Sequence, residues 1–117
     1  MIPHEIERHQ AQPQQVEIVL HLDPNLFWFG GHFAVQPLLP GVAQLDWVMH
    51  YATTLLAPGW RFHSIQNVKF KAPLLPETTV TLALSWQEAR QILAFSYQRH
   101  DGDARHTASS GKIRLCR

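Results

Sequence analysis

A histidine, a predicted helix start and an aspartate lie within fifteen residues of one another and could together move protons. His32 follows Gly30 and Gly31, which allow close approach of the backbone, and it is flanked by aromatic residues. An apolar environment keeps an imidazole neutral, so that it can act as a base. The alternative is a surface histidine, or one that is hydrogen-bonded within the core.

The predicted helix begins at Pro40 and Gly41, where proline is tolerated in the first turn. The first amide groups of a helix lack partners within it, and they stabilise an oxygen that gains negative charge. Gly41 leaves this end open. Asp46 follows on an otherwise apolar helix, and we expect it to be buried with a partner. The pattern favours proton transfer on a carbonyl compound, with a structural aspartate as the alternative.

The aspartate and the free amides of the helix start must belong to the same helix. Apolar residues recur at three- and four-residue steps over 40–56, which predicts a helix there. Other apolar residues lie on its remaining faces, so we expect the helix to be buried on nearly all sides. Ala57-Pro58-Gly59 is expected to end it.

Strands are predicted before and after this helix. Residues 15–22 alternate between apolar and polar, and four further strands follow at about 62–72, 80–86, 92–99 and 105–116. Asp101-Gly102 predicts a hairpin, and the small residues of 108–111 leave room for a helix to pack. In the strand at 62–72, strict alternation would place one set of side chains on one face: Phe62, Ser64, Gln66, Val68, Phe70 and Ala72.

The short connections among these strands predict an antiparallel sheet. The fold class is therefore α+β, with one long helix wrapped by a single antiparallel sheet. The 117 residues suit one domain, and the polar residues 1–14 form a tail or an edge element.

Composition excludes several function classes. The formal charge of +1 gives no reason to expect a nucleic-acid partner, and no apolar run is long enough to span a membrane. Cys116 is a single cysteine, so neither an internal disulfide nor a cysteine metal site is expected. The N-terminus lacks the features of a signal peptide. We expect a soluble cytoplasmic protein.

Two blocks of the sequence resemble the hot-dog 3-hydroxyacyl-acyl-carrier-protein dehydratases of fatty-acid synthesis. The first is Gly31-His32-Phe33, followed by Pro37, Pro40-Gly41-Val42 and Asp46. The second is the stretch from Val68 to Pro76. With the order of strands, the resemblance covers roughly residues 15–116.

The resemblance implies dehydration of a 3-hydroxyacyl thioester to the trans-2-enoyl thioester, with no metal or redox cofactor. The substrate would be carried on the phosphopantetheine arm of an acyl carrier protein. The resemblance also implies a hot-dog fold and at least a homodimer, with two sheets joined edge to edge. His32 of one subunit would then face Asp46 of the other.

The implied roles divide into three groups. His32 and Asp46 would be catalytic. Gly41 and Val42 would hold the thioester oxygen, with substrate contacts from Phe33, Leu38 and Leu39. Leu38, Leu39, Val42, Leu45 and Phe70 are candidates for the acyl-chain wall, but a role in the core is the first explanation for each. Three basic residues are candidates for docking the acidic carrier protein: Arg61, Lys69 and Lys71.

The chain departs from the family pattern after His32, where Ala34-Val35 replaces Pro-Gly. At position 46 it has aspartate, as in the isomerising branch of the dehydratase family, instead of the glutamate of the commoner branch. It resembles the small dehydratases of secondary-metabolite clusters such as those for aryl polyenes. Two alternatives stay open. One is a hot-dog thioesterase, and the other is a non-catalytic subunit that pairs with a partner dehydratase.

Overall fold

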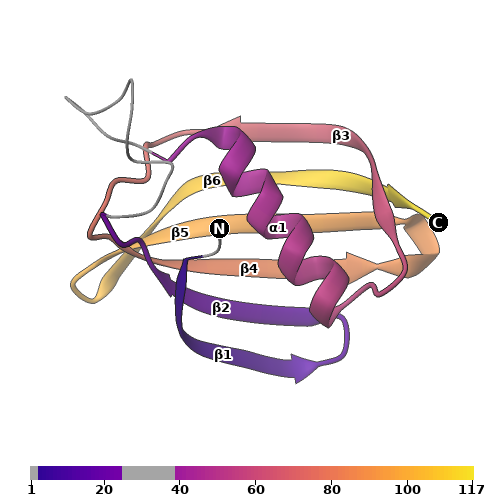
Figure 1. Ribbon diagram of the computed structural model, residues 1–117, viewed down its shortest axis with the longest axis horizontal. Helices are drawn as coiled ribbons and strands as arrows, with labels where there is room; N and C mark the ends of the chain where they lie inside the picture. The colour runs from indigo at the N-terminus through magenta and orange to yellow at the C-terminus, as the bar shows by residue number, and fades with distance from the viewer. Residues whose placement is uncertain (1–2, 25–38) are drawn as a thin grey trace.

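The computed structural model describes residues 3–24 and 39–117, which form one helix lying across one six-stranded sheet (Figure 1). Neighbouring strands are antiparallel throughout, in the order β1-β2-β4-β5-β6-β3. This confirms the predicted α+β class and the hot-dog arrangement. The elements are β1 (His4–Gln12), β2 (Gln15–His21), α1 (Gly41–Leu55), β3 (Arg61–Phe70), β4 (Thr79–Gln87), a short 3₁₀ turn (Glu88–Arg90), β5 (Ile92–Asp101) and β6 (Ala104–Cys116).

The strand pattern read from the sequence is confirmed at most positions. The polar N-terminal segment forms β1, an edge strand paired with β2. The hairpin between β5 and β6 turns at Gly102, whose φ of 61° is a conformation that glycine adopts without strain. The core lies between α1 and the sheet face formed by alternate residues of the strands, among them Ile18, Leu82 and Tyr97.

The expectation that α1 is buried on nearly all sides is wrong. Its buried face is formed by Ala43, Gln44, Trp47, Val48, Tyr51 and Ala52. The opposite face carries an exposed stripe at four-residue steps, namely Val42, Asp46, His50 and Thr54. A single sheet covers only one side of a helix, so the apolar residues on the other side stay uncovered within one chain.

The strict alternation expected for the third strand is also wrong. Two register shifts interrupt the pairing of β3 with β6, one between Phe62 and Ser64 and one between Ile65 and Asn67. Such a bulge inserts an extra residue and changes which side chains share a face. Ile65 pairs with the buried Ile113 on the helix side of the sheet, whereas Ser64 pairs with the exposed Arg114.

The small residues of β6 provide room, as predicted, but only part of that room is used by the helix. Ser109 is buried and its hydroxyl contacts the side chain of Gln44 in α1. A Cβ atom at Gly111 would instead lie 2.4 Å from the backbone oxygen of Asn67 in β3. The missing side chain of Gly111 therefore admits a neighbouring strand.

No helix within the described residues is long and apolar enough to cross a membrane.

Candidate active site

Asp46 lies on the exposed stripe of α1, about one turn beyond the start of the helix. Within residues 3–24 and 39–117 its carboxylate has neither a hydrogen bond nor an ion pair. The expectation of a buried, partnered aspartate is therefore wrong for a single chain, because the sheet covers the other side of the helix. An exposed carboxylate in this place is available to a substrate or to a second subunit.

Among the described residues, no side chain caps the start of α1. Pro40 is the N-cap residue and makes no side-chain capping hydrogen bond. Its carbonyl accepts from the amides of Ala43 and Gln44, at 3.1 and 3.2 Å. The amides of Gly41 and Val42 point from the positive end of the helix dipole, and no acceptor for them lies among the described residues.

Phe70 forms one wall beside this helix start. A Cβ atom at Gly41 would lie 2.7 Å from Cζ of the Phe70 ring, so the ring lies directly against the glycine. Phe70 is half exposed and Val42 is two-thirds exposed. The predicted contacts Gly41, Val42 and Phe70 are thus brought together.

Of the remaining predicted substrate contacts, some lie in or against the core and the others lie outside the described residues. Leu39 is 2% exposed and belongs to the core cluster, where its amide donates to the carbonyl of Leu74 at 2.8 Å. Leu45 is partly buried against the same cluster. His32, Phe33 and Leu38 lie outside the described residues.

A buried polar network lies directly beneath the helix start, and it was not predicted from the sequence. The Ser109 hydroxyl donates to Gln44 Oε1 at 2.6 Å, and Gln44 Nε2 donates to the carbonyl of Leu39 at 3.3 Å. The Tyr97 hydroxyl donates to the backbone carbonyl of Gln44 at 2.5 Å. Gln44 is 3% exposed. A glutamine among the apolar residues of the predicted helix is the feature of the sequence that could have indicated this network.

Burial raises the pKa of Tyr97 well above its ordinary value, and the nearby Tyr51 and Asp46 act in the same direction. The phenol therefore stays protonated over the whole range in which an enzyme works. It remains a hydrogen-bond donor to the first turns of α1.

Exposed apolar side chains lie at the start of α1 and along β3, the outermost strand of the sheet formed by the described residues. We call them the open-edge cluster: Val42, Phe62, Ile65 and Phe70. The three residues from β3 pair with buried residues of β6, so they lie on the helix side of the sheet. Apolar groups of this size at an unpaired strand edge mark a surface suited to association.

The outer face of the same two strands is basic. Arg61 and Lys69 of β3 and the following Lys71 are exposed, as are Lys112 and Arg114 of β6. Neither β3 nor β6 contains an acidic residue. The predicted docking residues thus lie on a surface of a single sign of charge.

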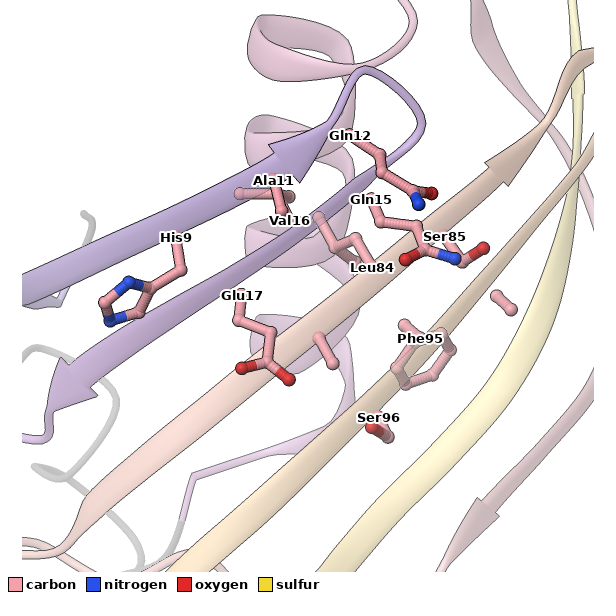
Figure 2. A pocket seen from close by; sticks show the side chains of 12 residues that line it. His9, Ala11, Gln12, Gln15, Val16, Glu17, Leu84, Ser85, Phe95 and Ser96 are labelled. Atoms are coloured by element: carbon pink, nitrogen blue, oxygen red, sulfur yellow. The ribbon is translucent and has the colours of Figure 1, made fainter.

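The groove of about 430 Å³ shown in Figure 2 lies elsewhere. Its floor includes Glu17, Ala83 and Ser96, which are paired across β2, β4 and β5 and alternate with residues that face the helix. In Figure 2 α1 runs behind the strands. The groove is therefore on the sheet face away from Asp46 and is not the candidate site.

A search of residues 3–24 and 39–117 finds no group of three or more histidine, cysteine, aspartate or glutamate side chains that could hold a metal ion. The chemistry that the described groups offer is proton transfer at Asp46 and anion stabilisation at the helix start.

Comparison with known proteins shows the family to which the chain belongs. Residues 8–112 match the family described as ApeI-like, ApeI dehydratase. The 3-hydroxyacyl-acyl-carrier-protein dehydratase FabZ of Tolumonas auensis is 35% identical over 77 residues, which cover 57% of this chain and 50% of FabZ. The chain thus spans about half the length of the curated relatives it matches.

Solved structures extend the likeness over the whole chain. A chain of the dehydratase heterocomplex ApeI:P from Xenorhabdus doucetiae is 56% identical, with a TM-score of 0.94 and full coverage of both chains. The dehydratase domain of the polyketide PpsC from Mycobacterium tuberculosis shares the fold, with a TM-score of 0.77 at 18% identity, over all of this chain and 45% of that one. The chain belongs to the ApeI-like dehydratase family.

Proposed function

We propose that this protein dehydrates 3-hydroxyacyl thioesters to trans-2-enoyl thioesters in fatty-acid or polyene-type biosynthesis. The observation that carries the proposal is an exposed Asp46 beside the open, glycine-led start of α1, in a chain of the ApeI-like family. The thioester would be carried on the phosphopantetheine arm of an acyl carrier protein, as the FabZ relatives' name implies.

In the proposed mechanism, neutral His32 removes a proton from C2 of the substrate. The thioester oxygen gains negative charge and is held by the backbone amides at Gly41 and Val42. The electron pair from the C2–H bond forms the C2–C3 double bond as the C3–O bond breaks. Asp46, or a water that Asp46 holds, gives a proton to the departing hydroxyl, which leaves as water. These steps use side chains and backbone alone, so we propose that no metal or redox cofactor takes part.

We further propose that the site is completed by a second subunit. The open-edge cluster supports this, because it places exposed apolar side chains along β3, the outermost strand among the described residues, and Phe70 lies against Gly41 at the start of the helix that carries Asp46. Two sheets joined along this edge would cover the cluster and bring His32 of one subunit to Asp46 of the other. The second subunit is a copy of this chain or a homologous dehydratase. The similar chain from Xenorhabdus doucetiae belongs to a dehydratase heterocomplex, which supports the latter.

The basic outer face of β3 is proposed to receive the acidic carrier protein. The double reversal Lys69→Glu and Lys71→Glu is expected to raise KM for carrier-bound substrate about tenfold or more at low salt, since like charges oppose encounter. Turnover of a short pantetheine thioester should be unchanged. Steady-state kinetics with both substrates measures this.

The matched control is Arg90→Glu, which reverses a charge in the turn before β5, away from β3. An unchanged KM for carrier-bound substrate in the Lys69 and Lys71 variant would rule out this docking face.

The competing activity is thioester hydrolysis, because hot-dog folds host both reactions. Incubation with a 3-hydroxyacyl carrier protein, followed by intact-protein mass spectrometry, separates them. Loss of one water with the acyl chain retained is the expected result. Release of the whole acyl chain would establish a thioesterase. If the protein alone leaves the substrate unchanged, and dehydration occurs once a partner subunit is added, the protein is a subunit that depends on that partner.

A further inference from the structure

We propose that Gln44 is a positioning residue that fixes the start of α1 from beneath, in place of an N-terminal cap. The inference rests on the proposed function, since it concerns the helix end that would hold the thioester oxygen. The evidence is the buried network of Gln44, Ser109, Tyr97 and Leu39.

A helix start is usually fixed by a serine, threonine, aspartate or asparagine whose side chain accepts from the first amides. Such a cap would occupy the same amides that an oxyanion needs. Here the N-cap is Pro40, which has no capping side chain and makes no capping bond. Within residues 3–24 and 39–117 no acceptor lies on the amides of Gly41 and Val42, so the contact that holds the helix end in place must come from elsewhere.

Gln44 supplies that contact from the side away from the ligand. Its amide nitrogen donates to the carbonyl of Leu39, the residue just before the cap, at 3.3 Å. Its amide oxygen accepts from Ser109 of β6 at 2.6 Å. One side chain therefore ties the chain that enters the helix to β6 of the sheet.

Two further bonds complete this arrangement. The Tyr97 hydroxyl of β5 donates to the backbone oxygen of Gln44, and the amide of Leu39 donates to Leu74 at 2.8 Å. Gln44, Ser109 and Tyr97 are each at most 3% exposed. A buried polar network in which the members satisfy one another is rigid, and it fixes the backbone to which it is bonded.

An apolar residue would fill the position of Gln44 at lower cost, because burying an amide is unfavourable without its bonds. The glutamine on the buried helix face is explained if its hydrogen bonds hold the start of the helix in the position that catalysis requires. A displacement of about 1 Å at a reacting group can reduce a rate about 100-fold.

The test uses Gln44→Met, which keeps the shape of the side chain and removes both of its hydrogen bonds. We expect kcat for dehydration to fall about 10- to 100-fold with KM changed less than about threefold, because binding away from the reacting oxygen is retained. Hydrogen exchange of the Leu39 and Ala43 amides, which donate to the carbonyls of Leu74 and Pro40, should become at least about tenfold faster, as followed by NMR.

Thr81→Val is the matched control. Thr81 is equally buried, its hydroxyl is 2.6 Å from His100 Nε2, and it lies on the sheet face away from α1. It should lower the melting temperature by a comparable amount and leave kcat and both amides unchanged. Ser109→Ala combined with Gln44→Met should lower kcat no further than Gln44→Met alone, since both act through one network.

A kcat for Gln44→Met within about twofold of that for Thr81→Val would overturn the proposal. If the wild-type protein proves not to dehydrate, the proposed function fails, and amide exchange then decides the positioning role. Unchanged exchange of the Leu39 and Ala43 amides in Gln44→Met would overturn that role, and faster exchange confined to these two amides would uphold it.

Discussion

Asp46→Asn is expected to reduce dehydration of a 3-hydroxyacyl thioester by about 10²- to 10⁴-fold, the range that positioned proton transfer contributes. Asparagine has nearly the same shape as aspartate but cannot deliver a proton to the leaving hydroxyl. The measurement is the initial rate of enoyl thioester formation by the purified variant at saturating substrate.

The fold should be unaffected, which makes this substitution informative. Asp46 is exposed on α1, and no hydrogen bond or ion pair joins it to the described part of the chain. Exposed substitutions of this kind usually change the free energy of unfolding by less than about 0.5 kcal/mol. Thermal unfolding followed by circular dichroism should therefore give the wild-type melting temperature.

Asp103→Asn is the matched control, because it makes the same chemical change at an exposed position in the turn between β5 and β6. It should leave the rate unchanged. A wild-type rate in Asp46→Asn would exclude this carboxylate as the acid, and the hydroxyl would then have to leave by another route.

Gly111→Ala adds only one methyl group but is expected to lower the free energy of unfolding substantially. The added Cβ atom would lie 2.4 Å from the backbone oxygen of Asn67 and 2.9 Å from Cγ2 of Val68. A backbone oxygen in a paired strand cannot move aside alone, so β3 must shift away from β6. Overpacking of this kind costs about 1–3 kcal/mol, which for a domain of this size lowers the melting temperature by roughly 5–15 °C.

The neighbouring Ser110→Ala is the control, since it removes a hydroxyl and adds no atom to the contact between β3 and β6. It should stay within about 2 °C of wild type, as surface changes usually do. A similar melting temperature for Gly111→Ala would mean that β3 is free to move. Because β3 also carries three residues of the open-edge cluster, Gly111→Ala is expected to weaken subunit association as well, measurable by sedimentation velocity.

Local patterns in the sequence were enough to predict most of the fold. The alternation over 15–22 predicted β2, and the change of period after Pro40 predicted α1 to within a residue at each end. Asp101-Gly102 predicted the hairpin between β5 and β6. Each of these signals depends on residues close in the chain, where backbone preference and side-chain period act directly.

The features that could not be predicted depend on contacts between distant segments. Gln44 bonds with Ser109 and Tyr97, which are 65 and 53 residues away, and no local pattern links them. The bulges of β3 follow from its pairing with β6 at the C-terminus. The exposure of Asp46 follows from a single sheet covering one side of α1, which the apolar character of the helix concealed.

The candidate site was predicted from spacing and resemblance together. Spacing placed Gly41 and Asp46 at the start of one helix, and the structure bears this out. The arrangement of His32 relative to Asp46 stays a prediction, because it requires a second subunit.

The most direct test of a shared dehydratase site is the activity of mixed dimers. His32→Ala and Asp46→Asn subunits, co-expressed with different affinity tags and purified through both, should form dimers in which one of the two sites has both native residues. Each variant alone should be inactive, and the mixed dimer should recover about half of the wild-type dehydration rate, as expected for one intact site of two in a twofold-symmetric assembly. A mixed dimer as inactive as its parents would contradict the account.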